Sequence, residues 1–158
     1  DACFVRVEGF VFAHVADEGL IESCAGDLLR YRRAIGAEHI AVLADLKKKH
    51  SAHALTADVS LVETAHAAEF FHADGVILTG RATGEETDAR EVDEVAAAVR
   101  CGVFVGSGLT PGNLARFASA HGFIVGSSVK QGGVWSHPID PAACEAMGRA
   151  CAALPTRA

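Results

Sequence analysis

The stretch at 103–113, VFVGSGLTPGN, ends an apolar run in Gly-Ser-Gly and continues with Thr-Pro, a typical helix start. The stretch at 123–133, FIVGSSVKQGG, repeats the glycine-rich strand end. Turns of this kind leave backbone N–H groups open to an anion, because glycine has no Cβ to shield them. The alternative is that glycine ends these strands for steric reasons alone. We expect a phosphate site whose amide donors belong to five residues: Gly106, Ser107, Gly108, Gly126 and Ser127.

Five short apolar runs alternate with helical patterns along the chain. The expected strands are 3–10, 39–47, 75–80, 102–108 and 122–128. The expected helices are 18–35, 58–73, 89–100, 111–120 and 141–153, with caps at Gly36, Asp58, Asp88, Thr110 and Asp140. Strict alternation predicts an α/β fold with a parallel sheet, either doubly wound or closed into a barrel. No linker divides the chain, so we expect a single domain over 1–158.

Composition narrows the functional classes. The 158 residues carry a formal net charge of −6, which argues against a nucleic-acid surface that needs many Lys and Arg side chains. No apolar run reaches the roughly 20 residues of a transmembrane helix. The five cysteines are widely spaced, without a Cys-x-x-Cys motif, and this favours reduced thiols and a cytoplasmic location.

Charged and polar residues occur at the ends of the first three expected strands. Side chains alternate along a strand, so Asp45, Lys47 and Lys49 are expected on one face, with His50 at the rim. Arg6 and Glu8 end the first strand, and Thr79 and Thr83 follow the third. The functional interpretation is a substrate site. The alternative is an ion-pair network in which Arg6 and Glu8 pair with each other or with Asp45 and Lys47 across the sheet.

We assign candidate roles on the first interpretation. The catalytic candidates are Asp45, Lys49, Glu8 and His50, which supply acid, base or electrostatic stabilisation. The candidates for substrate binding are Arg6, Lys47, Thr79 and Thr83. His50 and His53 lie three residues apart, but no ligand motif surrounds them, so we expect neither a metal nor another cofactor.

Several segments together resemble the BtpA family. They are FVRVEGFVFAHVADEGLIE, LLRYRRAIGA, VLADLKKKHSAH, ADGVILTGRATGE, VFVGSGLTPGNL and FIVGSSVKQGGVWSHPIDP, in the order of the family and over almost the whole chain. The resemblance implies a (β/α)8 barrel of the ribulose-phosphate-binding type. The family is about 100 residues longer at the amino terminus, in line with the roughly 250 residues of a whole barrel. This chain is then expected to supply strands four to eight.

The resemblance also bears on function. It implies a binder of a small phosphorylated metabolite, and a possible sugar-phosphate enzyme; whether the chain is catalytic stays open. The alternative is a non-catalytic assembly factor, as in photosystem I biogenesis. The alternative to a cytoplasmic location is then an organelle, either the mitochondrion or a plastid. A five-strand piece exposes unpaired edges, so we expect a partner, a homo-oligomer or the rest of the protein to cover them.

Overall fold

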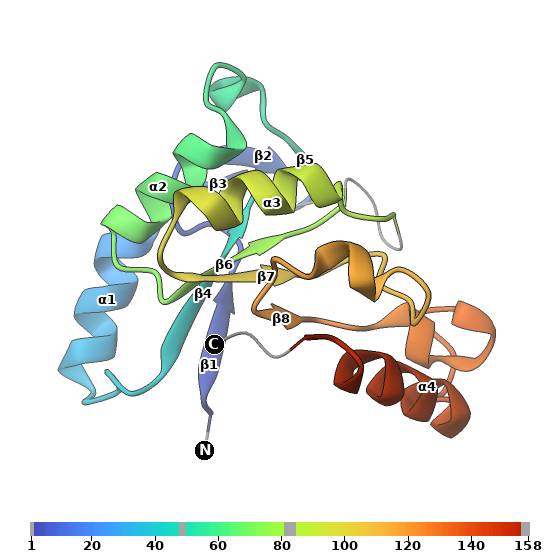
Figure 1. The fold of residues 1–158 in the computed structure, drawn as a ribbon. Helices are drawn as coiled ribbons and strands as arrows, with labels where there is room; N and C mark the ends of the chain where they lie inside the picture. Colours follow the sequence, from blue (N-terminus) through green and yellow to red (C-terminus); the bar gives the residue numbers. More distant parts are fainter. Residues whose placement is uncertain (1, 48–49, 81–84, 156–158) are drawn as a thin grey trace.

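The computed structural model of the chain describes residues 2–47, 50–80 and 85–155. Parallel strands form a five-stranded main sheet in the order β1-β4-β6-β7-β8 (Figure 1). Their bounds are β1 (Phe4–Val7), β4 (Ala41–Leu46), β6 (Gly75–Leu78), β7 (Gly102–Val105) and β8 (Gly122–Phe123). A smaller antiparallel sheet contains β3 (Gly19–Ile21), β2 (His14–Ala16) and β5 (Ser51–Ala52). The predicted α/β fold with a parallel sheet is confirmed.

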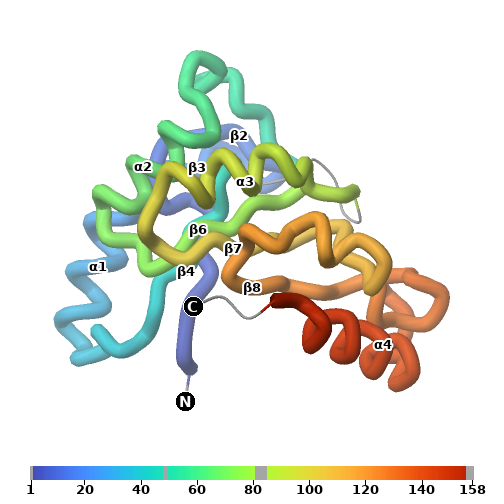
Figure 2. The backbone as a smooth tube through the Cα atoms, viewed as in Figure 1, coloured from blue at the N-terminus to red at the C-terminus, as the bar shows by residue number. Residues whose placement is uncertain are grey.

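The strands of the main sheet follow one another in space as they do in sequence, as the colour change from β1 to β8 shows (Figure 2). A doubly wound sheet contains a reversal of strand order, and the described strands contain none. Right-handed crossovers that always advance in one direction place their helices on one face of the sheet. Among the described residues β1 pairs only with β4, and β8 only with β7, so no closure is seen.

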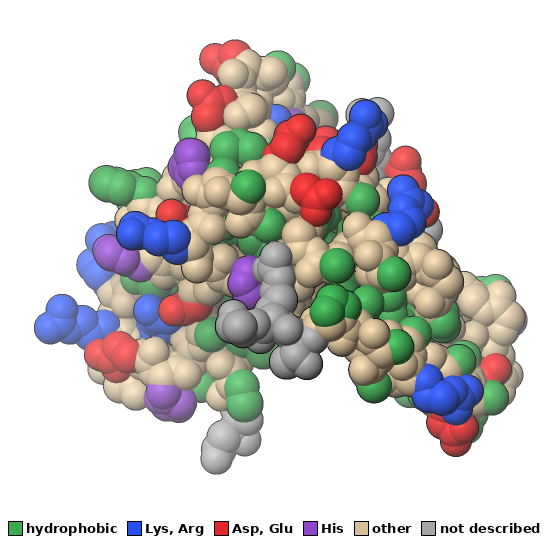
Figure 3. Space-filling model, viewed as in Figure 1, with side chains coloured by type: hydrophobic (Ala, Val, Ile, Leu, Met, Phe, Trp, Pro, Cys, Tyr) green, Lys and Arg blue, Asp and Glu red, His purple; other side chains and the backbone are tan. Residues whose placement is uncertain are grey.

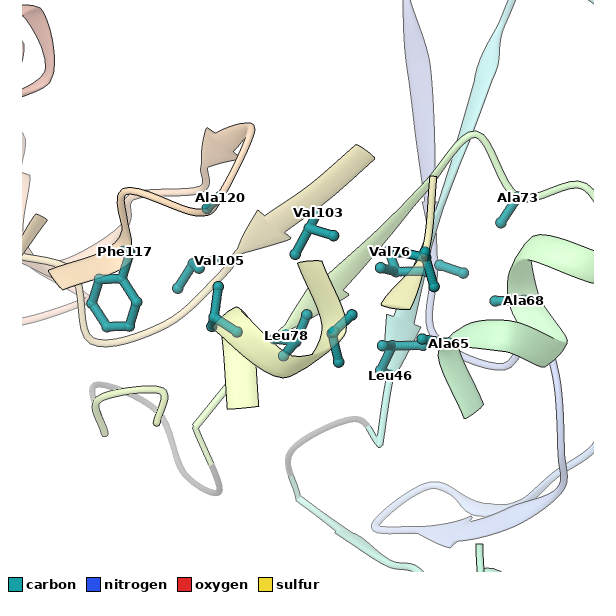
Figure 4. Close-up of a cluster of buried hydrophobic side chains, with 14 of the residues drawn as sticks. Leu46, Ala65, Ala68, Ala73, Val76, Leu78, Val103, Val105, Phe117 and Ala120 are labelled. Atoms are coloured by element: carbon teal, nitrogen blue, oxygen red, sulfur yellow. The ribbon is translucent and has the colours of Figure 1, made fainter. Parts of the chain in front are cut away.

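The hydrophobic core lies between the sheet and the helices α1 (Ala25–Ala34), α2 (Leu61–Phe70) and α3 (Ala89–Ala98). Alternate residues of β4, among them Val42, Ala44 and Leu46, point to this core. Figure 4 shows how it continues through Val76, Leu78, Val103 and Val105 to Phe117. Because side chains alternate along a strand, Asp45 and Ile77 lie on the opposite face. Polar residues at the carboxyl ends of the strands are therefore separated from the apolar core.

Several boundaries differ from the prediction by a few residues, and two differ more. Residues 19–21, within the predicted helix 18–35, form strand β3, and α1 begins only at Ala25. The reason is local: Gly19 has a φ of +116°, which an α-helix does not allow. The last predicted strand, 122–128, ends at Phe123, and the chain continues into the 3-10 helix η3 (Ser127–Val129).

The predicted α-helix over 111–120 is wrong. Only the short 3-10 helix η2 (Leu114–Phe117) forms there. Thr110 does not act as its cap; its N–H donates to Asn113 Oδ1 at 2.8 Å. Gly112 and Asn113 both have low helix propensity, which disfavours an α-helix over this segment. No α-helix therefore begins at the turn after β7, and no helix dipole contributes there.

Helix starts elsewhere are set by side-chain caps. Asp88 accepts the N–H of Arg90, and Asp140 caps α4 (Pro141–Ala152), both as predicted. Helix α2 is capped by Ser60 and not by Asp58: Ser60 Oγ accepts the N–H of Glu63 at 3.1 Å, and Glu63 Oε2 accepts the N–H of Ser60 at 2.8 Å. This reciprocal capping box lowers the pKa of Glu63, because its hydrogen bond from the Ser60 N–H favours the charged carboxylate.

Replacing Ser60 by alanine tests the capping box. Ser60→Ala removes the acceptor for the Glu63 N–H and should lower the free energy of unfolding by about 1 kcal/mol, measured by urea denaturation. Ser136→Ala is the matched control, because Ser136 is exposed and outside any helix. Equal effects of the two substitutions would contradict the assignment.

The surface carries charges of both signs. On the face shown in Figure 3, Lys and Arg side chains alternate with Asp and Glu in small groups. No helix in the described ranges has the length and apolar character required to span a bilayer.

Candidate anion site

The two glycine-rich turns meet at one pocket, although they lie in different β-α units. The pocket has a volume of about 260 Å3. It is lined by residues that follow β7 and β8 and by one glycine further on: Gly106, Ser107, Gly108, Leu109, Thr110, Ile124, Gly126, Ser127, Ser128 and Gly133. All five residues that the sequence predicted for phosphate binding are in this set. Their function as ligand contacts stays a prediction.

Gly106 differs from the other four. Its N–H donates to the carbonyl oxygen of Leu78 at 2.8 Å, so the predicted use of this amide as a ligand donor does not fit the structure. A Cβ on Gly106 would lie 2.9 Å from Ile77 Cγ2 and 3.3 Å from Thr79 Cγ2. Close packing between β6 and β7 explains the glycine, as the steric alternative stated.

The backbone amides of the other four predicted residues differ from that of Gly106. These residues are Ser107, Gly108, Gly126 and Ser127. Within the described ranges, no protein acceptor is found for these N–H groups. An N–H group without a protein acceptor can donate its hydrogen bond to an anion or to water. The pocket therefore brings together hydrogen-bond donors from two consecutive strand ends.

The turn after β7 is fixed by the segment that precedes α3. Ser107 Oγ donates to the carbonyl oxygen of Glu85 at 2.7 Å, and Thr87 Oγ1 donates to the carbonyl oxygen of Ser107 at 3.4 Å. Gly108 has a φ of +68°, and a Cβ there would come within 2.3 Å of Glu86 Cα. Only glycine fits at this position, because both the backbone conformation and the neighbouring chain exclude a side chain.

Asn113 supports the same turn, and the sequence analysis did not identify it. Its Nδ2 donates to the carbonyl oxygen of Gly108 at 2.9 Å, while its Oδ1 accepts the N–H of Thr110. An asparagine a few residues after a Gly-rich turn is a typical turn-stabilising residue, and this was the available signal. Asn113 acts by positioning the backbone of the pocket.

Gly126, on the other side of the pocket, has no such packing requirement. A Cβ built there meets nothing within 4 Å, and its φ of −126° is not in the left-handed region. The absence of a side chain at Gly126 therefore leaves open space on this side of the pocket. Ser128, which the sequence analysis did not select, also lines this pocket.

Alanine substitutions at the two glycines should have different effects on stability. Gly108→Ala should lower the free energy of unfolding by about 2 kcal/mol or more, because it combines a left-handed φ with a backbone clash. Gly126→Ala should change it by less than about 0.5 kcal/mol. Urea denaturation measures both, and similar losses would show that the two turns are not packed as described.

The polar strand ends contain an ion pair. Arg6 Nε and Nη2 donate to the two carboxylate oxygens of Asp45, each at 2.8 Å, and the Asp45 side chain is 1% exposed. Of the alternatives for these residues, the pairing of Arg6 with Asp45 is confirmed. The hydrogen bond to Asp45 raises the pKa of Arg6, with burial opposing it. Both Asp45 oxygens accept from Arg6, so this carboxylate is held in a fixed geometry.

Lys47 does not extend the face of Asp45. Strand β4 ends at Leu46, and Lys47 takes a φ of +46°, which interrupts the alternation on which the prediction relied. Its Nζ donates to the carbonyl oxygen of Val59 at 2.6 Å. Lys47 therefore stabilises the segment before α2.

A second, small cavity of about 20 Å3 lies at this end of the sheet, and Glu8, Asp45 and Lys47 are among its lining residues. His14 and His53, whose ring centroids are 5.3 Å apart, also line it. It shares no lining residue with the anion pocket. Among the described residues no group of three His, Cys, Asp or Glu side chains is placed to hold a metal ion.

The remaining candidates are distributed as follows. His50 is exposed, with a φ of +57°, and does not line the cavity at Asp45. Thr79 follows β6 beside Gly106, and its Oγ1 is buried without a hydrogen-bond partner in the described structure. Lys49 and Thr83 lie outside the described residues.

Removing one partner of the Arg6–Asp45 pair should destabilise the fold strongly. Arg6→Met removes two hydrogen bonds and a positive charge from a buried carboxylate and should lower the free energy of unfolding by roughly 2 to 3 kcal/mol. The control is Arg30→Met: its partner Asp27 is 87% exposed, and an exposed pair contributes only about 0 to 1 kcal/mol. Urea denaturation of both variants makes the comparison, and equal losses would contradict a buried pair.

Three relatives show what the sequence is similar to. An uncharacterized mitochondrial protein of Caenorhabditis elegans is 53% identical over 137 residues, which are 87% of this chain and 50% of the relative. An uncharacterized protein of Pyrococcus abyssi is 41% identical over 133 residues, 84% of this chain and 50% of the relative. The photosystem I biogenesis protein BtpA of Synechocystis is 35% identical over 162 residues, 99% of this chain and 56% of the relative.

The chain thus spans about half the length of the curated relatives it matches. Residues 1–152 match the family described as the BtpA family, in agreement with the resemblance of the motifs. The chain belongs to the BtpA family.

Proposed function

We propose that this chain is the carboxyl-terminal part of a (β/α)8 barrel that binds a small phosphorylated metabolite. The observation that carries the proposal is the pocket between the turns after β7 and β8. Its lining includes Ser107, Gly108, Gly126 and Ser127, whose N–H groups have no protein acceptor among the described residues. In such barrels the loops after strands seven and eight form phosphate sites with backbone donors.

The strand order supports the barrel. Five strands advance in one direction without reversal, and both edges of the described sheet lack a further strand. The chain covers about half of its relatives, so a further segment of similar size supplies the strands that close the sheet. Closure places Asp45, Arg6 and Thr79 on the inner face, near the mouth that contains the anion pocket.

The chemistry of the pocket defines the ligand class. None of the residues that line it is charged. An anion bound there interacts with backbone dipoles and hydroxyl groups, so the geometry of the donors determines selectivity. About 260 Å3 is near the lower end of the range for small-molecule sites, which suits a compact phosphate ester.

For catalysis we propose only a reaction class, carbonyl chemistry on a sugar phosphate, by analogy with the fold. Among the candidates, Glu8 and Asp45 are close enough to line one cavity. Both carboxylates interact with Arg6, and both stay candidates for moving a proton. Lys49 and His50 stay candidates for the same chemistry.

A second candidate function is assembly of a larger complex through protein contacts. The Synechocystis relative is named a photosystem I biogenesis protein, and its match covers 99% of this chain. Large apolar side chains are also exposed, including Phe70 at 77% and Trp135 at 72%. The name of the Caenorhabditis elegans relative favours the mitochondrion as an alternative to the cytoplasm for this chain.

Thermal stabilisation of the whole protein by inorganic phosphate and by a panel of sugar phosphates tests the proposal. A ligand at 100 times its dissociation constant should add about 2.7 kcal/mol of stability. Gly126→Asp projects a carboxylate into the open side of the pocket and should abolish the effect by charge repulsion, whereas Ser136→Asp, outside the pocket, should retain it. Stabilisation that survives Gly126→Asp would place the ligand elsewhere, and no stabilisation by any phosphate would favour the assembly function.

A further inference from the structure

Ser128 is the residue of the pocket whose buried hydroxyl oxygen has no protein partner in the described structure. It lines the pocket, and its Oγ is buried without a hydrogen-bond partner in the described structure. Buried hydroxyl groups are almost always hydrogen-bonded, because an unpaired one retains the cost of losing water. The unpaired Ser128 hydroxyl beside this pocket is therefore unusual and points to a partner that binding supplies.

The other hydroxyl groups of the pocket are accounted for. Ser107 Oγ donates to the carbonyl oxygen of Glu85 at 2.7 Å. Thr110 is exposed, and Ser127 is half-buried, so water has access to both residues. Ser128 is half-buried as a residue, like Ser127, but its Oγ atom is itself buried and has no protein partner in the described structure.

The backbone around Ser128 is held in place. The Val129 N–H donates to the carbonyl oxygen of Gly126 at 3.3 Å, and the Lys130 N–H donates to that of Ser127 at 2.9 Å. These bonds close the 3-10 turn η3, against which α4 packs. The hydroxyl is thus tethered to a fixed backbone. Because its Oγ is buried in its present position, it reaches a ligand in the pocket by rotation about χ1 to another staggered position.

We propose that the Ser128 hydroxyl is a side-chain contact of the bound anion and donates a hydrogen bond to one of its oxygens. This inference rests on the proposed function and adds a residue to that site. A phosphoryl oxygen is a suitable partner for this hydroxyl, because it is a strong acceptor for the hydrogen bond that the hydroxyl donates. The unpaired hydroxyl is then a feature of the unliganded protein that binding removes.

The test compares three variants of the whole protein, including any residues that precede this sequence, with inorganic phosphate as the probe. Ser128→Ala removes the hydroxyl and should raise the dissociation constant for phosphate about 10-fold or more, since hydrogen bonds to charged groups are strong. Without phosphate, the same variant should melt at the wild-type temperature or above, because the group it loses was unpaired. Ser128→Thr keeps a hydroxyl and should bind within a few-fold of wild type.

Ser107→Ala is the matched control for stability. It removes a hydroxyl from the same pocket, but one that is bonded to Glu85, so its melting temperature without phosphate should fall. The assignment is supported if the melting temperature without phosphate falls for Ser107→Ala but not for Ser128→Ala, and if Ser128→Ala also binds phosphate more weakly.

Two results would overturn the inference. If wild type binds phosphate and Ser128→Ala binds it equally well, the hydroxyl is not a contact, while the proposed function stands. If Ser128→Ala lowers the melting temperature of the unliganded protein without changing affinity, Ser128 serves packing alone. Absence of phosphate binding in wild type would remove the proposed function itself, and the inference with it.

Discussion

The site depends on the close approach of two backbone segments, the turn at 106–108 and the segment at 85–87. There is no room for a Cβ on Gly108, and Ser107 donates its hydroxyl to the carbonyl oxygen of Glu85. These contacts, with Asn113 on the other side, use the carbonyl groups of Ser107 and Gly108 but leave the N–H groups of these two residues without a protein acceptor among the described residues. The turn is therefore rigid and rich in donors, which is the combination that binding an anion requires.

The steric and functional explanations of the glycines are both needed, at different positions. Gly106 and Gly108 are glycines because neighbouring chain occupies the space of a side chain. Gly126 has no such neighbour, and its missing side chain leaves the pocket open. The turn after β7 is tightly packed and the turn after β8 is open, and together they form a pocket lined largely by backbone. The ion pair of Arg6 and Asp45 belongs to a separate part of the sheet end and contributes to stability there.

Much of this fold could be predicted from the sequence, because the strands are short apolar runs whose burial is a local property. The failures occurred where a non-local or conformational feature decides the structure. Thr110 and Pro111 suggested an α-helix, but only the 3-10 helix η2 forms, and the side chain of Asn113 donates back to the carbonyl oxygen of Gly108. The positive φ of Lys47 interrupts the alternation of β4, and its side chain bonds the carbonyl oxygen of Val59. No sequence pattern shows such a conformation in advance.

The candidate site, like the fold, was only partly predictable from the sequence. The convergence of the two glycine-rich turns was predictable, since the carboxyl ends of adjacent parallel strands meet at one edge of a sheet. Which N–H groups stay available was not, because the carbonyl of Leu78 that occupies the Gly106 N–H comes from another strand. The importance of Ser128 likewise depends on burial, which three-dimensional packing alone determines.

Amide NMR spectroscopy of the whole protein titrated with phosphate tests the central claim most directly. The account predicts that the N–H resonances of Ser107, Gly108, Gly126 and Ser127 shift together along a single binding curve, while that of Gly106 keeps the signature of its bond to Leu78. Saturating shifts confined to other residues, or no shifts in these turns at any phosphate concentration, would contradict it.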